Sequence, residues 1–400
     1  MEDGSLPEGA AGSAPPSAGA LPSPAPRPLL RRLRGWLLGT ALVSALGLIG
    51  KAAADMAADR VKDALGAAAS ADTACLLGEW WQAARGPEAP DPARFRVLIA
   101  RLDRDAEGAL TRKVVNAFRG QAGFDWRGSC VSVAAGASRA EQEAAVAAAE
   151  RLRRRHGADL VLWGEVVDAK EPAISVWFTA ENAAPDLKAR PWRFEKGLLE
   201  PAFQSGFAAA LAGVAVSTAT PALAQEGRYV ADLLRPLLPR LDSLLADLPP
   251  GLDGPARGRL RGTAALSFQT YGEQAGDEPP LRRAVALYGA AQQDLPRSEA
   301  PLDWAATQNN LGVALLRLGE RGDDVALRRA VAAYEAALEE YRRDRVPLHW
   351  AMTQNNLGIA LQVLGERGDD AALRRAVAAY EAALEEYRRD RVPLDWAMTQ

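Results

Sequence analysis

The chain of 400 residues is long enough for two or three domains, and its 48% hydrophobic and 25% charged residues are ordinary for a globular protein. A formal net charge of -3 excludes a protein that wraps duplex DNA by neutralising phosphates. The two cysteines, Cys75 and Cys130, form no CxxC pair or zinc-ligand motif, and two histidines leave at most two candidates for chemistry that needs clustered imidazoles. We therefore expect no metal, no cofactor, no nucleic-acid partner and no enzymatic activity.

The first 29 residues hold prolines among Gly, Ala and Ser and almost no large apolar side chain. Such a segment cannot bury enough surface to offset the entropy of ordering it, so residues 1–29 are predicted to be a disordered tail. Across the chain only six of the 48 basic residues are lysine, and alanine is abundant. This composition is typical of a high-GC bacterial gene.

A hydrophobic segment follows within residues 30–55: the arginines of 31–34 precede an uncharged run, 35–50, that Lys51 closes. As a helix the run is about 24 Å long, short of the roughly 30 Å hydrocarbon layer, although Lys51 can reach the interface. We predict a single-pass anchor that contacts the lipid bilayer through residues 35–51. The alternatives are a buried or interfacial helix, or a signal peptide cut near 52–54.

The flanking charges bear on location. The N-terminal arginines favour a cytoplasmic tail, which would place the chain after residue 55 outside the cytoplasm, anchored in a bacterial inner membrane. If the segment is not inserted, the protein is expected to be cytoplasmic. Residues 56–92 then read as a helical spacer and linker, rich in Ala and Gly and ending in prolines.

Residues 93–190 alternate between strand-like and helix-like patterns. Apolar runs predict strands at 95–102, 130–133, 160–166 and 173–179, and helical periodicity predicts helices at 109–118 and 138–155. Connections this long between the first three strands favour parallel neighbours, and the last two strands form a hairpin. The prediction is a small two-layer α/β domain.

The segment Gly157–Val166, GADLVLWGEV, follows a first strand that ends at Asp103. In this it resembles the small α/β domains of TolB N-terminal and curli-secretion type, which implies a docking module in the cell envelope. Asp103, Asp105 and Glu107 form an acidic cluster that is read either as helix N-terminal acids in a solvated loop or as a ligand-binding loop. The basic helix end 153–156 similarly stabilises a helix C-terminus or binds an anion.

Residues 191–257 read as a helical connector whose first helix, apolar all round at 207–216, is predicted to be buried.

The remainder, 258–400, is a repeat. Trp304, Trp350 and Trp396 are 46 residues apart, and the pentad LRRAV recurs at 281, 327 and 373 with the same period. Each unit divides into two amphipathic helices that cannot bury their apolar stripes alone, so we predict an all-α solenoid.

The spacing Ala330-x3-Tyr334-x2-Ala337, with Leu311-Gly312 on the preceding helix, resembles the tetratricopeptide repeat. The unit is longer than the usual roughly 34 residues, and Asn-Asn-Leu at 309–311 and 355–357 is similar to the kinesin-light-chain style of repeat. The resemblance implies a protein-binding array in which one face of each first helix lines a concave groove. The groove residues expected on a helical wheel are Asn309, Val313, Leu316, Asn355, Ile359 and Gln362.

Side-chain amides at these positions suit recognition of a peptide backbone, although the asparagines could instead cross-link adjacent repeats. We expect a non-enzymatic, membrane-anchored scaffold that binds protein partners. Because the pattern stops in mid-helix at Gln400, an alternative is the regulatory region of a longer protein whose effector lies beyond residue 400. A third possibility is a ligand-binding α/β protein that uses Asp103 and its neighbours.

Overall fold

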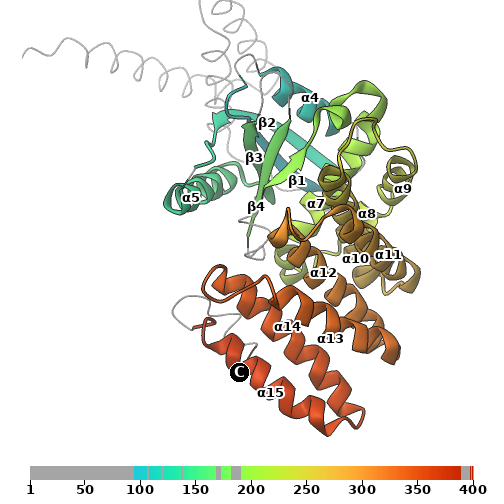
Figure 1. Ribbon diagram of the computed structural model, residues 1–400. Coiled ribbons are helices and arrows are strands. Elements are labelled where there is room, and N and C mark those ends of the chain that lie inside the picture. The colour runs from blue at the N-terminus through green and yellow to red at the C-terminus, as the bar shows by residue number, and fades with distance from the viewer. Residues whose placement is uncertain are drawn as a thin grey trace, which may run out of the picture. The chain divides into compact units, whose positions relative to one another are not determined.

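The protein was analysed as a computed structural model, which describes residues 94–105, 108–118, 121, 123–136, 138–167, 173–181, 191–388, 397 and 399. An α/β sheet domain precedes an array of helical hairpins (Figure 1). This order is the one that the sequence predicts. The predicted tail, anchor segment and spacer of residues 1–92 lie outside the described residues.

The sheet has five strands in the order β2-β1-β3-β4-β5. Their bounds are β1 Phe95–Arg101, β2 Phe124–Ser132, β3 Leu160–Val166, β4 Ile174–Ala180 and β5 Trp192–Phe194. Strand β1 runs parallel to β2 and β3, whereas β4 is antiparallel to both β3 and β5. The predicted parallel arrangement of β1, β2 and β3 and the predicted hairpin of β3 and β4 are thus confirmed. Helix α4 (Ala109–Phe118) connects β1 to β2, and α5 (Arg139–His156) connects β2 to β3, as parallel strands require.

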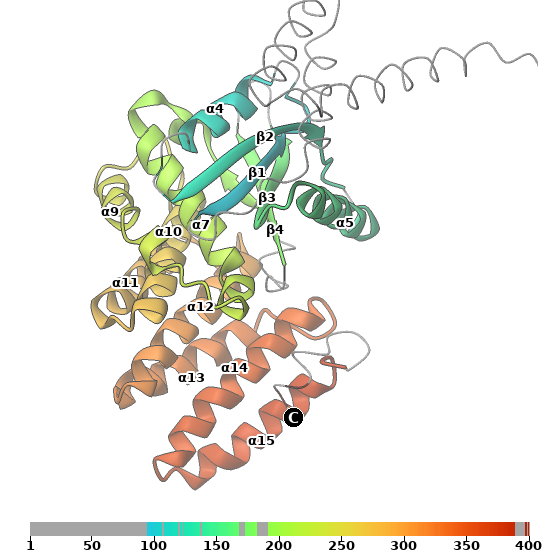
Figure 2. The same cartoon turned by 180° about the vertical axis from the view of Figure 1, so that it is seen from behind.

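Helices cover both faces of this sheet (Figure 2). Helix α5, Arg139–His156, packs on one face against Leu98, Val161 and the stacked rings of Trp163 and Trp177. On the other face lie α4, Ala109–Phe118, and α7, Gln204–Gln225. The sheet is therefore the middle of three layers, where the sequence predicts two, because α4 and α5 cover opposite faces and α7 lies on the same face as α4.

Two strands depart from the sequence prediction. Strand β2 begins at Phe124, before the predicted 130, because this edge strand leaves Arg127 and Gly128 exposed and so contains no continuous apolar run. Strand β5 was missed because its three residues are too few to show a period. Its pairing with β4 moves the end of the sheet domain past residue 190.

Helix α7 is apolar on all sides and lies inside the protein, as the sequence predicts. The window Pro201–Gln225, which includes the short 3-10 turn Pro201–Phe203, is the one stretch of the described residues that is long and apolar enough to cross a membrane, with a mean hydropathy of 1.6. However, 78% of its most apolar 18-residue window is buried in the protein. Gly206 and Gly213 let α7 approach its neighbours closely, since a Cβ there would contact Leu244 and Ser267 at 2.8 and 2.2 Å.

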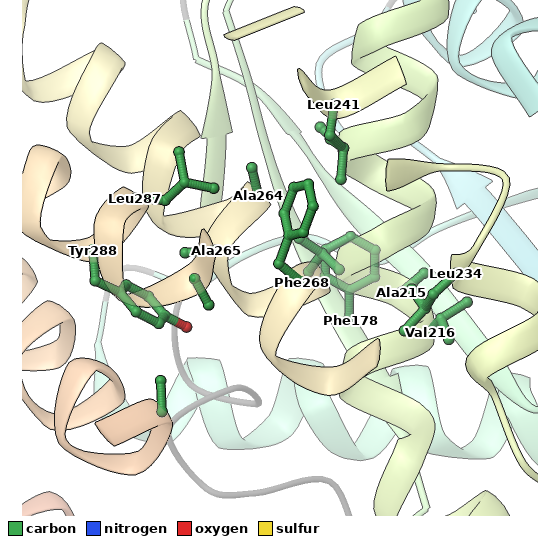
Figure 3. Packing of buried hydrophobic residues seen from close by; sticks show 14 of the residues in the cluster. Phe178, Ala215, Val216, Leu234, Leu241, Ala264, Ala265, Phe268, Leu287 and Tyr288 are labelled. Carbon is green, nitrogen blue, oxygen red and sulfur yellow. The ribbon is translucent and has the colours of Figure 1, made fainter. Parts of the chain in front are cut away.

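One apolar core runs from the sheet into the helices. Figure 3 shows Phe178 of β4 beside Ala215 and Val216 of α7, and Phe268 of α10 (Gly254–Ala275) near Leu241 of α9 (Leu238–Ala246). All of these side chains are buried. Helix α7 thus buries one side against the sheet and another against α10, which is how the sheet domain and the array share a core.

The array continues with antiparallel helix pairs. After the 3-10 turn Lys196–Leu199 and the short helix α8, Ala231–Leu234, the remaining helices are α11 Glu278–Asp294, α12 Pro301–Glu320, α13 Asp324–Leu338, α14 Pro347–Glu366 and α15 Asp370–Leu384. The pairs α10–α11, α12–α13 and α14–α15 pack as hairpins, and each hairpin packs on the next. The two-helix repeat unit is therefore confirmed.

Candidate functional site: the open face of the first helices

In the second and third hairpins, two glycines on the first helix face the second helix. A Cβ at Gly312 would lie 2.5 Å from the ring of Tyr334, and one at Gly319 would lie 2.9 Å from Leu327. Gly358 and Gly365 stand in the same relation to Tyr380 and Leu373 in the next hairpin. The absent side chains let the two helices approach closely, so this side of the first helix is wholly occupied by its partner helix.

A second side of the first helix faces the next first helix. Asn309 is 3% exposed, and its Oδ1 accepts a hydrogen bond of 3.2 Å from Nδ2 of Asn356, while Oγ1 of Thr353 lies 3.2 Å from the same oxygen. The Nδ2 of Asn309 donates to Oδ1 of Asn310 at 3.3 Å. The same link recurs one unit later, since Thr399 Oγ1 lies 3.0 Å from Asn355 Oδ1. Asn309 therefore cross-links α12 to α14.

Arginines also link successive hairpins. Arg321 donates to the carbonyl of Gly272 at 3.2 Å, and Arg367 donates to that of Gly319 at 2.6 Å. Arg297 lies 4.9 Å above the ring of Trp304, as Arg343 does at 5.7 Å above Trp350. The tryptophans that reveal the repeat thus pack under cations, each of which also pairs with glutamates of the following hairpin.

The six groove residues expected from the sequence fall into two groups. Asn309 and Leu316 are each 3% exposed, so their side chains are not offered to a partner. Val313, Asn355 and Ile359 are half-buried, and Gln362 is exposed. The reason is that α12 packs against α11 and α14 as well as against α13, whereas the helical wheel separates only the side that faces α13.

The open face of the first helices is displaced by about a third of a turn from the predicted one. On α12 it consists of Leu302, Ala306, Asn310, Val313 and Arg317, and on α14 of Leu348, Met352, Asn356, Ile359 and Val363, none of which is buried. Leu266 of α10 occupies the same register as Val313 and Ile359, six residues before the helix-pairing glycine. Leu266 was missed because the first unit is one residue longer than the others at that point.

A polar network borders this face between α10 and α12. Tyr288 Oη donates to Gln269 at 3.1 Å, and Arg317 lies 3.5 Å from Glu273 and 3.0 Å from Glu320. Burial raises the pKa of Glu273, an effect that Arg317 opposes. In the next hairpin Leu316 replaces the glutamine, and the hydroxyl of Tyr334 is buried without a hydrogen-bond partner, while burial raises its pKa.

The polar clusters of the sheet domain have structural roles. The carboxylate of Asp105 accepts hydrogen bonds of 2.7 Å from both the backbone N–H and the hydroxyl of Thr111, which fixes the start of α4. The guanidinium of Arg153 binds Glu150 and Glu181 at 2.9 Å and the carbonyl of Ala158 at 3.1 Å. These contacts tie the end of α5 to β3 and β4. Asp103 pairs with Glu165 through the backbone, and Glu107, the third member of the acidic cluster, lies outside the described residues.

Ligand-sized or metal-binding sites do not stand out in the described part of the chain. The cavity beside Arg96, Asp125 and His156 measures about 30 Å³, and the one beside Lys113 and Phe207 about 70 Å³. Both are far below the roughly 300 Å³ at which small-molecule sites begin. The described residues also contain no group of three His, Cys, Asp or Glu side chains that could hold a metal ion.

Comparison with known proteins gives no relative: no family model, no curated protein and no solved structure matches this chain.

Proposed function

We propose that this protein is a scaffold that binds a segment of a partner protein along the open face of α10, α12 and α14. The observation that carries the proposal is the alignment of Leu266, Val313 and Ile359 at one register of three successive first helices, where each side chain stays half-buried. A row of apolar side chains on a ridge of parallel helices suits an extended or helical segment with apolar anchors.

Two amides supply polar contacts on the same face. Because Asn309 uses Oδ1 of Asn310 and Nδ2 of Asn356, the amide nitrogen of Asn310 and the amide oxygen of Asn356 are left to face a ligand. One donates and the other accepts, which is the complement of a peptide unit. The 46-residue period, the hairpins and the two Asn-Asn-Leu motifs support assigning the array to the tetratricopeptide type.

The membrane location remains part of the proposal. We infer an anchor at residues 35–51 from the sequence, since the other candidate span, Pro201–Gln225, is mostly buried in the protein. Carbonate extraction of membranes tests this directly: the protein is expected to stay in the pellet, and its release into the supernatant would refute insertion.

The binding face is tested with the full chain by replacing Val313 and Ile359 together with glutamate. Both side chains are half-buried on the open face, so the change should leave the fold intact and weaken capture of partners from cell extract by about tenfold or more. A matched control is Tyr229→Glu, which alters a side chain that is 80% exposed and belongs to none of α10, α12 and α14. Unchanged capture by the double variant would remove the assignment.

A further inference from the structure

The second helices carry a recurring arginine whose ligand is visible in two of its three copies. Arg283, Arg329 and Arg375 occupy the same position of the pentad LRRAV, 46 residues apart. Arg283 of α11 binds the carboxylate of Asp242 on α9 at 2.7 Å, and Arg375 of α15 binds that of Glu335 on α13, two helices earlier in each case. In both copies the arginine at this position therefore forms an ion pair with a carboxylate from an earlier helix that lies beside its own.

Arg329 breaks the pattern. The residue that would supply its carboxylate, at the separation of 40 found between Glu335 and Arg375, is Gly289 of α11. Gly289 has no side chain, and a Cβ placed there would meet nothing within 4 Å. Among the described residues Arg329 is exposed and makes no ion pair, so an open notch lies where the other two copies hold a carboxylate.

Arg329 belongs to a patch of exposed side chains on α13. Val325, one turn earlier, is 66% exposed, and Arg328 and Ala332 on the same side are also exposed. The acids nearest on α13 are engaged elsewhere, Asp324 with Arg367 and Glu335 with Arg375. The patch therefore combines two uncompensated guanidinium groups with an apolar side chain on a rigid helix.

We propose that this α13 patch, formed by Val325, Arg328, Arg329 and Ala332 beside the notch at Gly289, docks an acidic segment of a partner protein. A glutamate or aspartate of the partner takes the place that Glu335 takes for Arg375, and an apolar side chain next to it covers Val325. A carboxylate is the favoured ligand because both other copies of this arginine bind one. The patch lies on the second helices, so its occupation is separate from that of the open face of the first helices.

The test uses the full chain in mild detergent and a fluorescein-labelled peptide of repeated Glu-Glu-Leu triplets, with a Gln-Gln-Leu peptide as the neutral probe. Replacing Arg328 and Arg329 with alanine should weaken binding of the acidic peptide by about tenfold. The double variant Arg240→Ala with Arg345→Ala removes the same charge from two other exposed arginines and should retain binding within about twofold.

Position 289 provides a sharper pair of variants. Gly289→Glu supplies the missing carboxylate within the chain and should weaken peptide binding as strongly as loss of the arginines, whereas Gly289→Gln, of equal size, should not. Both are expected to fold, since the position is open and either residue favours a helix over glycine. The proposal would be overturned if Gly289→Glu and Gly289→Gln changed peptide binding equally, or if Gly289→Glu bound the acidic peptide as well as the unaltered protein does. It would also be overturned if the protein bound the acidic and the neutral peptide with the same affinity, or if vesicles with anionic lipid bound through these arginines while the peptide did not.

Discussion

The sheet domain and the helical array are stabilised by contacts of different kinds. In the sheet domain each contact occurs once: the hydrogen bond from the Trp163 indole to Thr179 Oγ1 at 2.9 Å has no counterpart elsewhere in the described chain. In the array the contacts recur with the repeat, so Tyr334 against Gly312 can be compared with Tyr380 against Gly358. The repeats therefore provide internal controls, and a position that departs from its copies marks a change of role.

The largest expected effect tests the sheet side of this comparison. A Cβ at Gly164 of β3 would lie 2.1 Å from the backbone oxygen of Ser175 on β4, and backbone cannot move aside as a side chain can. Gly164→Ala is expected to lower the free energy of unfolding by about 3 kcal/mol or more, because the strands must separate. Urea unfolding monitored by circular dichroism measures this, and a loss below about 1 kcal/mol would contradict it.

The next effect lies inside the array. Gly312→Ala forces the Tyr334 ring to move and should cost about 2 kcal/mol. Gly289→Ala, also within a helix but with nothing near the new Cβ, should instead stabilise by up to about 1 kcal/mol through helix propensity. Thermal unfolding of the two variants should therefore shift in opposite directions, and a common direction would show that the hairpin contact is not the cause.

Two tyrosines at one repeat position give a smaller pair of opposite shifts. Tyr288 donates to Gln269, so Tyr288→Phe leaves a buried amide short of a partner and should cost about 1 kcal/mol. Tyr334 has a buried hydroxyl with no partner, because Leu316 replaces the glutamine, and Tyr334→Phe should stabilise by about 1 kcal/mol. Destabilisation by Tyr334→Phe would mean that this hydroxyl makes a hydrogen bond in solution.

The smallest effect is a pH dependence in the sheet domain. A hydrogen bond from Arg153 lowers the pKa of Glu150, against the opposing effect of burial. A carboxyl group whose pKa is lower in the folded state stabilises the protein above its ordinary pKa, and this contribution is lost as the pH falls through the folded value. Glu150→Gln should therefore reduce the loss of stability on acidification by less than about 1 kcal/mol, since the pair is partly exposed. An unaltered acid limb of the stability profile would contradict this.

The sequence alone predicts the repeat and most of the sheet, because both depend on local patterns. The pentad LRRAV and the tryptophans define a period without reference to tertiary contacts, and the capping box of Ser138 with Glu141 forms at the predicted start of α5. The sequence predicts that helix α7 is buried. It does not predict that α7 covers one face of the sheet, since the helix is apolar on all sides and no one side is marked as the contact surface.

The open face could be predicted only in part. A helical wheel separates the side of α12 that faces α13 from the rest, and Val313 and Ile359, which are half-buried, belong to that remainder. It does not show which of the remaining sides meets the next first helix, and Asn309 and Leu316 lie there. The asparagine pair carries the signal, since cross-linking of adjacent repeats is the alternative that the sequence leaves open, and Asn309 makes that link to Asn356.

Photo-crosslinking in living cells decides whether partners bind on the open face of the first helices. A photoreactive amino acid is placed one site at a time at Val313, Ile359 and the exposed Tyr229 of the intact protein. We predict that the first two positions capture the same discrete partner band and that Tyr229 does not. Equal crosslinking at all three, or a band from Tyr229 alone, would contradict the claim.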